Sequence, residues 1–352
     1  MQLRKFARWL LKSDQPNAQR TRRLVKFAIV LGLLIALFWI VPLRSVVQAL
    51  LKTDPLLFAV GVVLSLITIL LTSVQMKPLL ENQGINRSIL QINNINLAVK
   101  FYLLLMPTSL VASGYRWYRF AQPEGKVTES FVALAFFRLF RTFLVLTMGL
   151  GFLLISMQQN YIFRVGWIAL LVLGIIVIWV VITRYSIPIY TWFRKHAGFI
   201  LDRSFLQSFL SIVEKILSSA SSYADMPIPA LLLSMSAGIL AILVGIASGV
   251  YLARAIGIDL GFLELGWALS IMSLATQFTL SIMEGLGVRE VTLVAVLSLF
   301  NISAEQALAF SFLIFCRGVI ISLLGGLIEA LNTLQNNRST TPDTIPGEGK
   351  EI

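Results

Sequence analysis

Long apolar runs constrain this chain more than any other feature of its sequence. A helix that rises about 1.5 Å per residue needs roughly 20 apolar residues to cross about 30 Å of hydrocarbon. Only 13% of the 352 residues are charged, against about 25% in soluble domains, which excludes a soluble globular enzyme. The chain is therefore predicted to be an all-α polytopic membrane protein. The apolar runs that approach or reach the required length are 25–43, 56–74, 127–155, 162–183, 228–252 and 307–331.

Two further stretches, 95–122 and 262–300, are apolar but interrupted by Pro and Gly. If each dips into the membrane and returns on the same side, 21 Lys and Arg fall in the cytoplasm, 5 outside and 3 at membrane depth. If each crosses instead, the asymmetry expected from the positive-inside rule is far weaker. We therefore expect about six full spans plus two re-entrant broken-helix hairpins. The expected hairpin apices are Pro107, Gly114, Gly285 and Gly287.

Positive charge also predicts the orientation of the chain. The first 26 residues hold eight Lys and Arg, and such a patch normally stays in the cytoplasm. We expect a basic cytoplasmic N-terminus over 1–24, a single transmembrane domain over 25–331 and a disordered cytoplasmic tail over 332–352, in a protein integral to the plasma membrane. Residues 204–217 place apolar side chains on one helical face, which predicts an amphipathic helix at the membrane surface.

The two interrupted stretches carry similar short motifs. Arg116 is followed after 17 residues by Ala-Leu-Ala-Phe at 133–136, and Arg289 is followed after 18 residues by the same tetrapeptide at 307–310. This spacing predicts two repeats, over about 56–157 and 228–331, which the preferred topology makes inverted. Coincidence is the alternative, because short matches are common in sequences rich in Ala and Leu.

Charged residues at membrane depth cost roughly 2.5–3.5 kcal/mol each on insertion scales, so their retention suggests a function or a partner. One hypothesis is that arginines hold an anionic lipid headgroup through bidentate bonds. The alternative is that they reach the interface or pair with a neighbouring carboxylate; we assign Arg119 and Arg141 to this alternative. The candidate headgroup-binding residues are Arg116, Arg138, Arg289 and Arg317, and the candidate proton or pairing sites are Glu284 and Glu290.

Few residues are available for catalysis or for cofactors. With one His and one Cys, a His/Cys metal site is not expected, because it needs three or four converging ligands. The sequence contains no G-x-x-x-x-G-K-[ST] loop, so no nucleotide cofactor is expected and transport would be downhill or ion-coupled. The basic residues flank a span rather than alternate with aromatic residues, so no nucleic acid partner is expected. The expected partners are membrane lipids, with a lipid-synthesis enzyme as a further candidate.

Residues 107–141 and 284–317 together resemble the transmembrane region of lysylphosphatidylglycerol synthases and related stand-alone flippase-like membrane proteins. The string Gly-Leu-Gly-Val-Arg-Glu at 285–290 is the most specific part, and the resemblance covers about residues 25–331. It implies a lipid-transporting membrane domain. The positions that match the family pattern are Pro107, Gly114, Arg116, Arg138, Gly285, Gly287, Arg289, Glu290 and Arg317.

The sequence departs from the family pattern at three places. Glu284 replaces a glycine, the usual proline before the second motif is missing, and Arg141 stands where the family commonly has an acid, so headgroup choice is expected to differ. In the bifunctional synthases a soluble aminoacyl-transfer domain follows, whereas here a short tail follows, so lysyl transfer is not expected.

The leading hypothesis is a flippase-like lipid translocator that moves an anionic, aminoacyl or glycosylated phospholipid between leaflets, not an enzyme. The alternatives are an integral-membrane lipid-modifying enzyme and a structural subunit of a lipid-synthesis complex.

Overall fold

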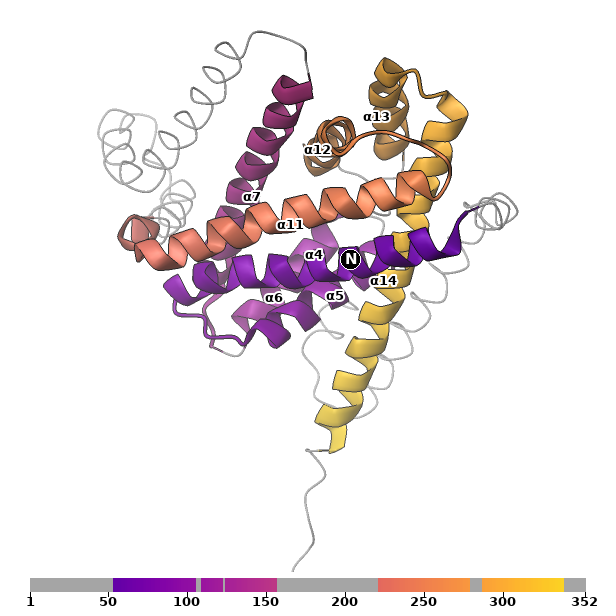
Figure 1. The fold of residues 1–352 in the computed structure, drawn as a ribbon. Helices are drawn as coiled ribbons and strands as arrows, with labels where there is room; N and C mark the ends of the chain where they lie inside the picture. The colour runs from indigo at the N-terminus through magenta and orange to yellow at the C-terminus, as the bar shows by residue number, and fades with distance from the viewer. Residues whose placement is uncertain (1–52, 106–108, 123, 157–220, 279–286, 339–352) are drawn as a thin grey trace, which may run out of the picture.

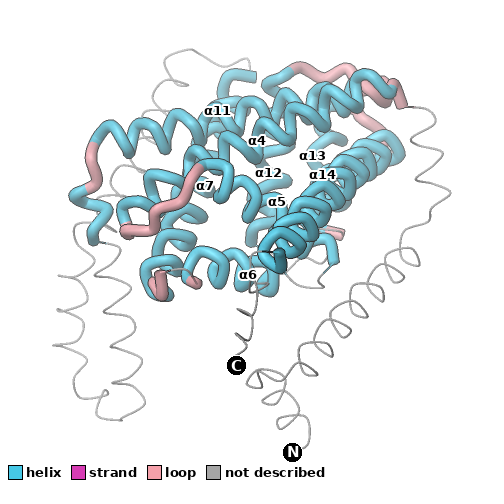
Figure 2. The backbone as a smooth tube through the Cα atoms, turned by 90° about the horizontal axis from the view of Figure 1, so that it is seen from below, coloured by secondary structure: helices cyan, strands magenta, loops and turns pink. Residues whose placement is uncertain are grey.

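The computed structural model describes residues 53–105, 109–122, 124–156, 221–278 and 287–338, and within these ranges all regular structure is helical (Figures 1 and 2). The predicted spans 25–43 and 162–183 and the predicted amphipathic helix 204–217 lie outside the described residues, as do residues 1–24. The fold can therefore be compared with the sequence over the two predicted repeats.

Four of the predicted spans form helices that are long and apolar enough to cross a membrane: α4 (Pro55–Asn82), α7 (Val127–Ser156), α11 (Ile228–Arg254) and the part Ala304–Leu331 of α14. Large apolar side chains remain exposed along them. On α4, Val63, Ile67 and Leu70 are all at least 40% exposed, and their spacing places them on one helical face. Such a face is suited to contact with lipid.

The last helix, α14 (Ala304–Arg338), corrects one expectation. It continues seven residues into the tail that was predicted to be disordered from residue 332. The physical reason is that residues 332–338 contain no Pro or Gly and the first proline beyond them is Pro342, so nothing in this segment breaks a helix that has already formed.

Each interrupted stretch contains two described helices, separated by residues outside the described ranges. α5 (Ile89–Leu105) and α6 (Ser109–Ala121) flank Pro107, and α12 (Phe262–Phe278) and α13 (Val288–Leu297) flank residues 279–286. The short 3₁₀ helices η2 (Ser222–Asp225) and η4 (Ser298–Phe300) precede α11 and follow α13. The predicted interruptions at Pro107 and Gly285 lie outside the described residues, and the re-entrant course through a membrane stays a prediction.

Two of the predicted apex glycines have different conformations. Gly114 lies inside α6, so the chain does not turn there; a helix tolerates an interior glycine at a cost of about 1 kcal/mol relative to Ala. Gly287 immediately precedes α13 with φ +88°, a conformation that glycine adopts readily because it has no Cβ. Pro107 and Gly285 lie outside the described residues.

The helices α4 and α11 lie side by side and antiparallel (Figures 1 and 2). Near one end of the pair, the Asp54 backbone N–H donates to the Ala255 carbonyl at 3.0 Å. Toward the other end, the Ser234 hydroxyl donates to the Gln75 carbonyl at 2.9 Å. The first long helices of the two halves therefore run in opposite directions.

Each half packs its last long helix against the 17-residue helix of the other half: α7 against α12, and α14 against α5. Glycines permit both close approaches. A Cβ on Gly149 of α7 would lie 2.6 Å from the Cβ of Ser270, and a Cβ on Gly325 of α14 would lie 2.1 Å from the Leu97 carbonyl oxygen. The order of long, 17-residue, short and long helices thus occurs in both halves with the same pattern of neighbours.

Candidate functional site

Three arginines gather where α7 packs against α6, α4 and α12. Arg138 and Arg141 are three residues apart and share one face of α7, near the middle of this candidate span. Arg116 projects from α6, and electrostatic repulsion from Arg141 and Arg138 acts on its guanidinium. We call Arg116, Arg138 and Arg141 the arginine cluster.

Neutral groups on neighbouring helices orient two members of the arginine cluster. Arg138 donates through Nη2 to the Gln277 carbonyl of α12 at 2.7 Å. Arg141 donates through Nη1 to Thr72 Oγ1 of α4 at 2.8 Å. A carbonyl and a hydroxyl can position a guanidinium, but neither carries the full negative charge that would neutralise it.

The third member, Arg116, has an unsatisfied donor. Its Nε atom is buried and has no hydrogen-bond partner among the residues that the structure describes. A buried donor without a partner costs free energy of about 1–3 kcal/mol, and more when the group is charged. The arginine cluster therefore combines positive charge with hydrogen-bonding capacity that an anion could use.

Nearby carboxylates are engaged with other side chains. Glu329 of α14 accepts a hydrogen bond from the Tyr115 hydroxyl at 2.8 Å and lies 3.8 Å from Arg119. Glu124 lies within 4 Å of Arg87 and Lys126. None of the ion pairs in the described part of the chain includes a member of the arginine cluster.

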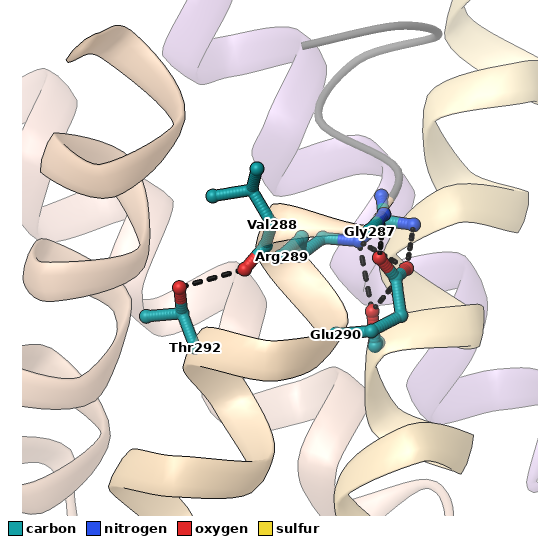
Figure 3. Close-up of polar contacts among 6 residues, drawn as sticks. Gly287, Val288, Arg289, Glu290 and Thr292 are labelled. Atoms are coloured by element: carbon teal, nitrogen blue, oxygen red, sulfur yellow. Dashed lines mark hydrogen bonds and ion pairs between the residues drawn. The ribbon is translucent and has the colours of Figure 1, made fainter. Parts of the chain in front are cut away.

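In the second half, Arg289 forms a complete internal pair (Figure 3). Its side chain is 3% exposed. Nη2 donates to Glu290 Oε1 at 2.7 Å and Nε donates to Ser311 Oγ at 2.8 Å. Glu290 also accepts the Gly287 backbone N–H through Oε2, and the Ser311 hydroxyl donates to Oε1 at 2.9 Å. Arg289 is thus neutralised by its neighbour in sequence and joined to α14.

The fourth predicted arginine, Arg317, lies at the α4–α11 contact. Its Nη1 donates to Ser248 Oγ at 3.2 Å, and Ser248 Oγ lies 2.8 Å from Ser65 Oγ. Of the four candidate headgroup-binding arginines, the structure therefore brings together Arg116 and Arg138 and places Arg289 and Arg317 in other contacts.

The sequence interpretation left out Arg141, which completes the arginine cluster. Its spacing from Arg138 was the available signal, because residues three apart share a helical face. Glu284 lies outside the described residues. Within the described ranges, no group of three or more His, Cys, Asp or Glu side chains is arranged to hold a metal ion.

Comparison with known proteins identifies the family. The profile described as the lysylphosphatidylglycerol synthase TM region matches residues 23–326. Neither the curated proteins nor the solved structures contain a match. The match covers most of the chain, and four of its helices could span a membrane. The chain is therefore an integral membrane protein that belongs to the lysylphosphatidylglycerol synthase TM region family.

Proposed function

We propose that this protein moves a lipid with an anionic headgroup between membrane leaflets, with the arginine cluster as the headgroup site. The observation that carries the proposal is the charge of this cluster. Two guanidinium groups lie near the middle of the candidate span α7 and one lies on α6, with no carboxylate partner among the described residues. Guanidinium forks bind phosphate oxygens through paired hydrogen bonds. Charges at this depth are costly unless they serve a function or have a partner.

The arrangement of the helices supports transport as the function. Transporters with inverted repeats place their sites where broken helices from the two halves meet. Here α6 of the first half contributes Arg116 to the arginine cluster. Gln277, in the last turn of α12 of the second half, accepts the hydrogen bond from Arg138. Helices of both halves thus contribute to the proposed headgroup site.

The orientation belongs to the same proposal. In the plasma membrane, we expect both termini and the segment 184–227 to face the cytoplasm, because this arrangement gives the 21-to-5 distribution of Lys and Arg. In a variant whose Cys316 is replaced, a single cysteine at Ser204 should resist an impermeant maleimide in intact cells, and one at Ser45 should react. Labelling at Ser204 would contradict the two-hairpin topology.

The transport proposal is tested with the full-length protein in vesicles that contain a fluorescent phosphatidylglycerol. Arg116→Gln and Arg141→Gln should each slow translocation at least tenfold. Because each change removes one of several mutually repelling charges, both variants should melt in detergent at or above the parental temperature. Arg254→Gln, at the exposed end of α11, is the matched control and should transport normally.

Two outcomes would contradict this function. Parental transport rates in both Arg116→Gln and Arg141→Gln would eliminate the headgroup role of the cluster. A new lipid species in extracts from the vesicles would instead favour the lipid-modifying enzyme.

A further inference from the structure

The charge of the arginine cluster also bears on which headgroup the site accepts, an inference that rests on the proposed function. Guanidinium groups stay protonated at all physiological pH values, so the three side chains contribute three positive charges. The hydrogen bonds that Arg138 and Arg141 form with described residues go to a neutral carbonyl and a neutral hydroxyl. Since no ion pair among the described residues includes the arginine cluster, an anionic ligand would supply compensating negative charge.

The number of donors points in the same direction. Each guanidinium presents a fork of several N–H donors, and Arg138 and Arg141 each use one nitrogen in the contacts with Gln277 and Thr72. A phosphodiester such as phosphatidylglycerol offers a single charge on two free oxygens. A phosphomonoester or a diphosphate offers more charge and more free oxygens, and so satisfies the donors of three neighbouring guanidinium groups better.

A cationic group on the ligand would meet repulsion at the arginine cluster. An aminoacyl-phospholipid carries an ammonium group close to its phosphate. Among the described acids near this end of α6, Glu329 already contacts Tyr115 and Arg119. This carboxylate is therefore already engaged with other side chains.

We propose that the arginine cluster selects lipids whose headgroup ends in a phosphomonoester or a diphosphate and discriminates against headgroups that carry an ammonium. The total negative charge of the headgroup at the arginine cluster sets this selectivity.

Binding to the purified full-length protein in detergent tests this selectivity independently of transport. The probes are dihexanoyl phosphatidic acid, farnesyl diphosphate, dihexanoyl phosphatidylglycerol and a short-chain lysyl-phosphatidylglycerol, measured by calorimetry. The first two should bind at least tenfold more tightly than phosphatidylglycerol, with the lysyl lipid weakest. Tighter binding of the lysyl lipid than of phosphatidic acid would overturn the proposal.

A pH series adds a readout that a structural role would not change. A phosphomonoester loses its second proton near a pKa of about 6, whereas a phosphodiester keeps one charge. Affinity for phosphatidic acid should therefore rise several-fold between about pH 5 and pH 7.5, while affinity for phosphatidylglycerol stays constant. Equal pH dependence of the two ligands would contradict selection by charge.

Charge reversal at a single residue tests the mechanism. Arg141→Glu should lose affinity for phosphatidic acid and gain affinity for the lysyl lipid, while Arg254→Glu should change neither. Inorganic phosphate alone should bind more weakly than phosphatidic acid, and tighter binding of phosphate alone would overturn the assignment to a lipid. Binding with the expected selectivity but without translocation would contradict the proposed transport function and leave the selectivity established.

Discussion

The two halves of the molecule treat corresponding arginines in opposite ways. Matching the Ala-Leu-Ala-Phe strings places Arg141 of the first half opposite Phe315 of the second, and matching the Gly-x-Arg motifs places Arg116 opposite Arg289. The positive charge of Arg141 repels the Arg116 guanidinium, whereas the Arg289 guanidinium lies 5.7 Å from the centre of the Phe315 ring. At equivalent places, a charge in one half is replaced by an aromatic face in the other.

The residue that follows each arginine makes the same distinction. Trp117 follows Arg116, and its indole N–H donates to the Val127 carbonyl at 2.8 Å. Glu290 follows Arg289 and pairs with it. The two halves therefore differ at two related positions, Trp117 against Glu290 and Arg141 against Phe315. These differences leave Arg289 neutralised and Arg116 in a positively charged site. The repeated Gly-x-Arg motif therefore does not by itself identify a binding residue.

The largest effect is expected at the ion pair of the second half. Glu290→Gln removes the negative charge beside Arg289, which is 3% exposed. Breaking a buried pair costs about 3–5 kcal/mol because the remaining charge is uncompensated. We expect a clearly lower melting temperature in detergent and reduced accumulation in membranes.

The double variant Arg289→Met with Glu290→Gln serves as the control and should recover much of the lost stability, since no unpaired charge remains. Normal melting of Glu290→Gln alone would show that Arg289 does not depend on this carboxylate, and the contrast between the halves would be lost.

A smaller effect is expected where the halves interlock. Gly325→Ala would place a Cβ 2.1 Å from the Leu97 carbonyl oxygen, and backbone cannot move aside as a flexible side chain can. We expect a destabilisation of about 1–3 kcal/mol, the usual cost of overpacking, measured as a loss of melting temperature. Gly114→Ala is the matched control: it lies within α6 and its Cβ would meet nothing within 4 Å. This control should be neutral or slightly stabilising.

A third variant gives the first half the residues that surround the arginine in the second half. Trp117→Glu combined with Arg141→Phe supplies Arg116 with a carboxylate and an aromatic neighbour. Translocation should fall at least tenfold, or about 1.4 kcal/mol, in the vesicle assay described above. Melting should change little, since a charge repulsion is removed while the Trp117 hydrogen bond is lost. Transport at the parental rate would mean that neutralising Arg116 does not matter.

Much of the fold was predictable because it depends on local sequence. Apolar runs of sufficient length predicted α4, α7, α11 and the membrane-length part of α14, since a helix satisfies its own backbone hydrogen bonds in hydrocarbon. The interruptions predicted from Pro107 and from the Gly-rich string at 284–287 stay predictions, because Pro107 and residues 284–286 lie outside the described residues. Gly114 was a wrong choice for an apex, because a single glycine within a helical segment lowers stability without ending the helix.

The candidate site was only partly predictable. The Arg289–Glu290 pair was one of the alternatives from sequence, because the two residues are adjacent. The unpaired state of Arg116 was not predictable, since Glu329, the nearest acid in space to its neighbours Tyr115 and Arg119, lies more than 200 positions away in sequence. Arg141 was assigned to a structural role because its partner, Thr72, is 69 positions away.

The amino-acid sequence alone determined that this chain is a helical membrane protein of this family, with arginines inside long apolar runs. Those properties depend on run length, helix breakers and motif spacing, which act over a few residues. Which arginines are neutralised and which gather was decided by tertiary structure. Spacing along a helix specifies which side chains share a face, but only packing specifies which other helix that face meets.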